Sequence, residues 1–105
     1  MIPVREGDVF WLLTEPVFHP HVVVEAGAAE LVACALTTNL HRAKDLGNVL
    51  LEVGEGDLPK QSVVVVSQRI VVAPESLGER IGSLSEERLA QIRAGLRFQQ
   101  SFLAR

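Results

Sequence analysis

The stretch at residues 47–68, GNVLLEVGEGDLPKQSVVVVSQ, holds the longest run of β-branched residues in the chain. Its four consecutive valines, residues 63–66, lie between two serines, and such a short apolar run is typical of a strand covered on both faces. A second apolar run, at residues 48–53, precedes it. Residues 54–59 join the two runs with glycines and a proline, which favour a turn. The stretch therefore predicts two strands joined by a wide turn, with the valines in a central strand.

The N-terminal segment predicts the first strand at residues 7–13, GDVFWLL, entered through a Gly-Asp turn. Successive side chains of a strand point to opposite faces, so Val9, Trp11 and Leu13 share one face. We expect this face to be apolar and Trp11 to lie in the core.

Two prolines follow, and we expect Pro16 and Pro20 to interrupt regular structure. A short strand then resumes at residues 21–24, HVVV. Residues 25–30 form a compact turn, after which residues 31–36, LVACAL, predict another buried strand. None of these strands is connected to the next by a segment of helix length.

The C-terminal third predicts more extended chain and then the only long helix. Residues 69–72 continue the valine strand, and residues 78–81 form a short strand after a turn. Ser83 and Glu86 have the spacing of a capping box, while Ser85 is an alternative N-cap for the same helix. Apolar residues then recur at helical spacing: Leu89, Ile92, Leu96 and Leu103.

The order of these elements predicts the fold class. Many short strands and one late helix, without alternation of strand and helix, indicate a mainly β fold with α (α+β). We expect a small antiparallel β-barrel or curled sheet with the C-terminal helix packed against it. The chain has no repeat, low-complexity segment or internal linker, so residues 1–105 are expected to form a single domain.

The composition limits where the protein acts and what it binds. No apolar run approaches the roughly 18 residues that span a membrane, and the first residues lack the pattern of a signal peptide, so we expect a cytoplasmic protein. The single cysteine, Cys34, cannot form an internal disulfide and lies inside an apolar run, where an inert buried thiol is expected. The net charge of −3 gives no general signal for nucleic acid. An RNA site must therefore be a local basic patch.

The best local basic cluster is at residues 37–44, TTNLHRAK. Hydroxyl and amide residues leave the preceding strand and are followed by basic ones, which favours a surface loop or a single helical turn.

Several segments also occur in an order and spacing that, taken together, are specific to one protein family. They are GDVFW at 7–11, HPHVVV at 19–24, ALTTNL at 35–40, GNVLL at 47–51, GEG at 54–56, LPKQSVV at 58–64, SQ at 67–68 and LGERIG at 77–82. In these segments the chain resembles the MazF/PemK family of toxin endoribonucleases over nearly its whole length.

The resemblance implies an SH3-like barrel that forms a homodimer and is the toxin of a type II toxin-antitoxin system. Such a toxin would cleave single-stranded mRNA at a short sequence motif, leaving 2′,3′-cyclic phosphate and 5′-hydroxyl ends. It would need no metal and no cofactor. A cognate antitoxin would silence it by covering the RNA groove with an extended acidic tail.

The resemblance also places the catalytic residues. The family's usual catalytic arginine falls on His19, and the form His-Pro-His is similar to one branch of the family. Histidine can exchange protons near neutral pH, so His19 suits the step. The family's catalytic threonine falls on Thr37. Positions where some members carry an arginine and an acidic residue are Val65 and Ser67 here, and the loops between the first three strands look shorter than is usual.

Other polar residues near these positions are candidates for binding RNA. They are His21, Thr38, Asn39, His41, Arg42, Lys44, Lys60 and Gln68.

Each site residue also has a simpler interpretation. His19 and His21 have a spacing that suits metal ligands, although no third ligand accompanies them. His21 could equally bond a backbone carbonyl, and Thr37 could satisfy backbone groups at a strand end. The whole chain could be a binding module without nuclease activity, because the same fold inhibits DNA gyrase in a related toxin family.

Overall fold

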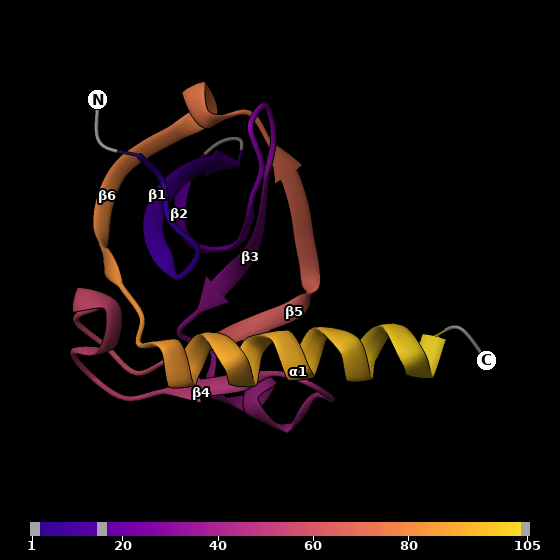
Figure 1. Ribbon diagram of the computed structural model, residues 1–105. Coiled ribbons are helices and arrows are strands. Elements are labelled where there is room, and N and C mark those ends of the chain that lie inside the picture. The colour runs from indigo at the N-terminus through magenta and orange to yellow at the C-terminus, as the bar shows by residue number, and fades with distance from the viewer. Residues whose placement is uncertain (1–2, 15–16, 104–105) are drawn as a thin grey trace.

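The computed structural model describes residues 3–14 and 17–103, whose strands form one antiparallel sheet. In these residues the sheet has six strands in the order β4-β5-β3-β2-β1-β6. The strands are β1 (Asp8–Thr14), β2 (Val17–Ala26), β3 (Leu31–Thr37), β4 (Val49–Leu51), β5 (Ser62–Val72) and β6 (Leu77–Ser83). Figure 1 shows the sheet curling around, with helix α1 (Glu86–Leu103) across its lower end. The predicted α+β architecture with a C-terminal helix is confirmed.

Short 3-10 helices occupy three of the connections between strands in the described chain. They are η1 (Leu40–Lys44) after β3, η2 (Glu55–Asp57) between β4 and β5, and η3 (Pro74–Ser76) between β5 and β6. Residues 37–44 were predicted to form a surface loop or a single helical turn, and the structure shows the helical turn as η1. Within residues 3–14 and 17–103, none of the helices has the length and apolarity needed to cross a membrane.

The four valines at residues 63–66 form the buried half of β5. All are at most 1% exposed, as expected for a strand covered on both faces. Val64 pairs with Val49 of β4, which confirms the two strands and the wide turn predicted around residues 54–59. Val64 and Val66 belong to the same core cluster as Ile92 of α1. Cys34 on the neighbouring strand β3 is also buried, as predicted.

A serine side chain caps the N-terminus of helix α1. The Ser85 hydroxyl oxygen accepts a hydrogen bond from the backbone N–H of Arg88 at 3.1 Å, so Ser85 and not Ser83 is the N-cap. Leu89 and Ile92 are buried against the sheet, and Leu96 is half-buried. Leu103, predicted to continue this apolar face, is the last residue of α1, and its side chain is not among those that the structure describes.

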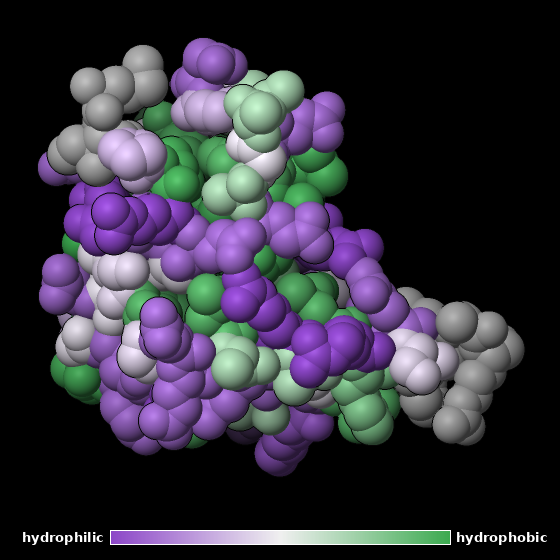
Figure 2. Space-filling model, viewed as in Figure 1, coloured by the Kyte–Doolittle hydropathy of each residue, from purple (hydrophilic) through white to green (hydrophobic). Residues whose placement is uncertain are grey.

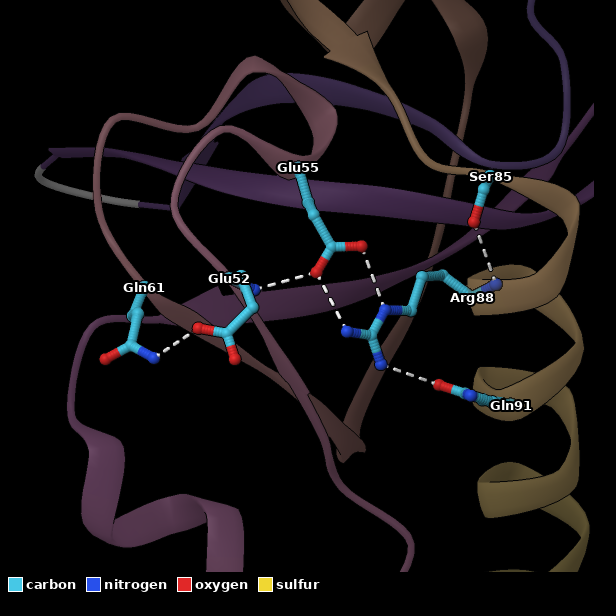
Figure 3. Close-up of polar contacts among 6 residues, drawn as sticks. All are labelled: Glu52, Glu55, Gln61, Ser85, Arg88 and Gln91. Carbon is cyan, nitrogen blue, oxygen red and sulfur yellow. Dashed lines mark hydrogen bonds and ion pairs between the residues drawn. The ribbon is translucent and has the colours of Figure 1, made fainter.

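Two glycines let α1 rest directly on the loop before β4. A Cβ at Gly95 would collide with the carbonyl oxygen of Gly47. Gly47 itself has a φ of +83°, a conformation that favours glycine. The first turn of α1 is also tied to the turn η2 by an ion pair between Arg88 and Glu55 (Figure 3). Helix, loop and turn are therefore held as one layer below the sheet.

The prediction that Trp11 lies in the core is wrong. Trp11 is 41% exposed, whereas Val9 and Leu12 are buried. The ladder between β1 and β6 shifts register between Val9 and Phe10 and again between Phe10 and Leu12. These irregularities break the simple alternation that put Val9 and Trp11 on one face.

The predicted start of the second strand is also wrong. β2 begins at Val17 and runs through Pro20, which lies opposite Trp11 of β1. Pairing of β2 with β3 starts only at His21. Pro20 therefore has a neighbouring strand on one side only, and a missing N–H is tolerated at such an edge. The break predicted at Pro16 lies outside the described residues.

Candidate functional site

A hollow of about 380 Å³ opens where β2, β3, β5 and η1 meet. It is lined by His19, His21, Ala35, Leu36, Thr37, Arg42, Gln68 and Ile70. The predicted residues that it brings together are therefore His19, His21, Thr37, Arg42 and Gln68. They come from four different elements, β2, β3, β5 and η1. They become neighbours only because the strands pair in the folded sheet.

Strand β2 places its two histidines on the same face, two residues apart. His19 is exposed, whereas His21 is only 3% exposed. The Nδ1 atom of His21 lies 3.1 Å from the carbonyl oxygen of His19. A carbonyl oxygen can only accept, so Nδ1 is the donor in this bond. The simpler interpretation of His21, a bond to a backbone carbonyl, is therefore confirmed.

Burial determines the protonation of His21. Loss of hydration has the largest effect and lowers the pKa of its imidazole, the hydrogen bond to the His19 carbonyl opposes this, and the neighbouring His19 ring makes the smallest contribution and lowers the pKa. Burial therefore favours the neutral ring.

Thr37 ends β3 at the edge of the hollow. Its hydroxyl oxygen accepts from the backbone N–H of Asn39 at 3.1 Å. The Asn39 side chain in turn caps η1 by accepting from the backbone N–H of His41 at 3.2 Å. Thr37 thus satisfies a backbone group at the strand end, yet its hydroxyl proton remains free to donate to a ligand.

Arg42 reaches the hollow from η1. Its Nε atom donates to the Asp45 carboxylate at 2.6 Å, and its two Nη atoms have no partner among the described residues. Asn48 holds this turn in place: its Nδ2 donates to the Arg42 carbonyl at 2.8 Å, while its Oδ1 accepts from the Val66 N–H at 3.0 Å. Sequence reasoning missed this role of Asn48. The signal was its position in the GNVLL segment next to the basic cluster.

Gln68 reaches the hollow because β5 is irregular. Cys34 of β3 pairs with Arg69, and the next residue, Ala35, pairs with Val65. Residues 66–68 therefore bulge from the ladder, and the strand bends there, as Figure 1 shows for β5. Residues 66–68 contain no glycine or proline, so the sequence did not predict this bulge.

The other predicted RNA-binding residues do not line the hollow. Thr38, Asn39, His41 and Lys44 lie on or just before η1, at exposed positions beside Arg42. Lys60 is exposed in the turn before β5. Apolar lining residues that sequence reasoning did not name are Ala35, Leu36 and Ile70.

The paired histidines do not form a metal site with other described residues. In residues 3–14 and 17–103, no three side chains among histidine, cysteine, aspartate and glutamate converge in a way that could hold a metal ion.

Two further hollows lie elsewhere on the surface. One of about 400 Å³ is lined by Trp11, Phe18, Gly78 and Glu79. Another, of about 210 Å³, gathers three arginines between α1 and the sheet: Arg69, Arg93 and Arg97. The face that carries α1 is mostly hydrophilic, with hydrophobic residues showing between β6 and β5 above it (Figure 2).

Comparison with known proteins identifies the family of this chain. A family model described as "PemK-like, MazF-like toxin of type II toxin-antitoxin system" matches residues 5–99. The chain belongs to this toxin family. The predicted resemblance to MazF/PemK toxins is thereby confirmed, whereas no curated protein sequence matches the chain significantly.

Three solved structures share the fold at low sequence identity. An endoribonuclease from a mycobacterial species is 19% identical with a TM-score of 0.78, covering 96% of this chain and 94% of its own. A mycobacterial endoribonuclease in complex with its cognate antitoxin is 17% identical, with a TM-score of 0.76 and coverage of 96% of both chains. A MazE-MazF structure from Deinococcus radiodurans is 21% identical, with a TM-score of 0.73 and coverage of 98% and 97%. The six-stranded sheet with its C-terminal helix is thus the MazF-like fold.

Proposed function

We propose that this MazF-like toxin cleaves single-stranded mRNA, at a short sequence motif, in the hollow between β2, β3, β5 and η1. The observation that carries the proposal is the convergence of His19, Thr37 and Arg42 on one hollow from three separate elements. The products would be 2′,3′-cyclic phosphate and 5′-hydroxyl ends, formed by attack of the ribose 2′-hydroxyl on the adjacent phosphate. The reaction would require no metal ion and no cofactor.

Such a cleavage needs proton transfer and stabilisation of the charge that develops on the phosphate. His19 is exposed at the hollow and can exchange protons with water and with a bound ribose-phosphate. The free hydroxyl proton of Thr37 can be donated to a phosphate oxygen. The Nη atoms of Arg42 supply the positive charge. We therefore assign His19 and Thr37 to catalysis.

The surface beside the hollow would hold the rest of the RNA. Thr38, Asn39, His41 and Lys44 lie on or just before η1 and offer polar and basic groups to neighbouring phosphates and bases. Gln68 offers its amide from β5, and Lys60 adds a charge near the start of that strand. These residues position the substrate in the proposal and do not react.

The proposal includes two protein partners. Similar structures are described as complexes with a cognate antitoxin or as MazE-MazF, and we propose that an antitoxin covers the hollow of this chain. We also propose a homodimer that acts in the cytoplasm. The exposed apolar side chains of Trp11, Leu13, Val17 and Phe18 give β1 and β2 a surface suited to a contact between copies.

The test is an assay of the purified protein with a long single-stranded RNA in EDTA, from pH 5 to pH 9. We expect discrete fragments with cyclic phosphate ends. Absence of such fragments at every pH would contradict the proposal. Capture of DNA gyrase from a lysate by protein that cleaves no RNA would instead favour the binding module.

A further inference from the structure

His21 is a buried titratable group that the proposed mechanism leaves without a task. Its side chain is 3% exposed, yet it lines the same hollow as His19 and Thr37. A buried polar ring on a strand of valines needs a hydrogen-bond partner, and Nδ1 has one in the His19 carbonyl at 3.1 Å.

That bond determines the tautomer of the neutral ring. The His19 carbonyl accepts, so the proton of the imidazole must be on Nδ1. In this tautomer Nε2 carries a lone pair and can only accept a proton. The strand backbone therefore presents Nε2 of His21 as a base.

The other ring nitrogen, Nε2, retains a small accessible surface. It has no hydrogen-bond partner among the described residues, and no fully buried side-chain nitrogen or oxygen in that part of the chain lacks a partner. Nε2 must therefore reach the accessible surface, and His21 lines the hollow.

We propose that His21 is a second catalytic residue: its Nε2 is the general base for RNA cleavage, and His19 is the general acid. The proposal rests on the proposed ribonuclease function and names the group that accepts the first proton. It divides the two tasks between a buried and an exposed histidine on one strand face.

Nε2 of His21 takes the proton of the ribose 2′-hydroxyl while the 2′-oxygen forms a bond to phosphorus. The bond from phosphorus to the 5′-oxygen breaks, and the 5′-oxygen takes a proton from the imidazolium of His19. His21 ends protonated and His19 neutral, and exchange of protons with water restores both.

The surroundings of His21 suit a base. Other titratable or charged groups that line the hollow are His19 on β2 and Arg42 on η1. Strands β3 and β5 contribute the uncharged Thr37 and Gln68. The residues paired with His21 are Phe10 of β1 and Ala35 of β3. Burial lowers the pKa of His21 from its ordinary value, so the neutral ring persists into mildly acidic solution.

The assignment predicts a bell-shaped dependence of cleavage on pH. The rate rises as the pH rises through the pKa of His21, since only the neutral ring can take a proton. A base and an acid that work in opposite protonation states give such a bell-shaped dependence, with the acid limiting the rate at higher pH. The acidic limb should have its midpoint below pH 6.5, the ordinary pKa of histidine.

The main experiment compares initial cleavage rates of the wild type and of His21→Asn in EDTA across this pH range. The asparagine amide takes the place of Nδ1 and can still donate to the His19 carbonyl, but it has no group at Nε2. We expect a loss of about 10² to 10⁴-fold and disappearance of the acidic limb, with a similar melting temperature. Cleavage by His21→Asn within about threefold of wild type, with the acidic limb retained, would overturn the base role and leave the proposed function intact.

A second measurement uses the wild type alone and does not depend on a variant that folds. Nitrogen-15 NMR of the histidine rings should show His21 as the Nδ1–H tautomer, titrating at the midpoint of the acidic limb. An Nε2–H tautomer, or a titration that does not coincide with that limb, would overturn the inference. A wild type that cleaves no RNA at all would overturn both the inference and the proposed function.

Discussion

Arg88 donates from Nε and Nη2 to the two carboxylate oxygens of Glu55, and both hydrogen bonds are 2.9 Å long. Arg88 lies in the first turn of α1, and Glu55 opens the turn η2 after β4. Glu55 also accepts from the backbone N–H of Glu52 at 2.7 Å, and Glu52 accepts from Gln61 at 2.6 Å (Figure 3). The pair thus joins the helix to both ends of the connection between β4 and β5.

Replacing Arg88 should test this link. Arg88→Lys keeps the charge but loses the two parallel bonds, so we expect a loss of about 1 kcal/mol in the free energy of unfolding, measured in urea. Arg97→Lys on the same helix is the control, because Arg97 has no ion-pair partner among the described residues. An equal effect of both substitutions would contradict a specific role for the pair.

The same pair makes stability depend on pH. The hydrogen bond from Arg88 lowers the pKa of Glu55 in the folded protein. The stabilisation is therefore present above the unfolded pKa, about 4.3, and is lost as the pH falls through the folded pKa. Glu55→Gln should be less stable than wild type at pH 7 by about 1 kcal/mol, since the side chain is partly exposed, and the difference should shrink in acid. A difference in stability between the two proteins that is constant from pH 7 to pH 3 would contradict this role of Glu55.

Gly95→Ala should destabilise the protein, although alanine is a better helix former by about 1 kcal/mol. The added Cβ would collide with the Gly47 carbonyl, so α1 would have to move away from the loop before β4. We expect a net loss of about 1 to 3 kcal/mol on chemical denaturation. Stabilisation by this substitution would show that helix and loop do not touch as described.

Asn48→Asp should loosen η1. The carboxylate cannot donate to the Arg42 carbonyl, so we expect a loss of about 1 to 3 kcal/mol in stability and weaker cleavage. Asn39→Asp is the control, because Asn39 uses its side-chain oxygen to accept from His41 and aspartate does the same. Equal stability of the two variants would contradict the role assigned to Asn48.

The thiol of Cys34 should be inert. Burial raises its pKa to about 11, with Arg69 opposing the shift, so only about a thousandth of it is thiolate at pH 8. Its reaction with a disulfide reagent should be at least about 100-fold slower in the native protein than in denaturant. Equal rates would place the thiol at the surface.

Local patterns in the sequence predicted much of the fold. The run of valines at residues 63–66 and the apolar segment around Cys34 indicated buried strands, because burial on both faces leaves a continuous apolar run. Ser85 was one of two possible caps, since both serines precede the helix at suitable distances. Trp11 was misplaced because alternation holds only while a ladder is regular, and the irregular pairing of β1 with β6 is not visible in either strand alone.

The candidate site was predicted less completely, for a related reason. Family resemblance indicated His19 and Thr37, and the basic segment indicated Arg42. The bulge at residues 66–68 that brings Gln68 to the hollow depends on how β5 meets β3 and bends. The tautomer of His21 depends on a backbone carbonyl of its own strand in the folded geometry. The position of Gln68 and the tautomer of His21 thus depend on the folded structure and could not be predicted from local patterns in the sequence.

In our proposal RNA is cleaved in the hollow that His19 lines. The most direct test compares His19→Ala with Glu30→Ala, a substitution of an exposed residue between β2 and β3 that lies outside the hollow, in cleavage of one RNA in EDTA at pH 7. We predict a loss of at least about 100-fold for His19→Ala with a melting temperature within a few degrees of wild type, and a change of only about twofold or less for Glu30→Ala. Cleavage by His19→Ala at the wild-type rate, with cyclic phosphate ends, would contradict the catalytic role of His19.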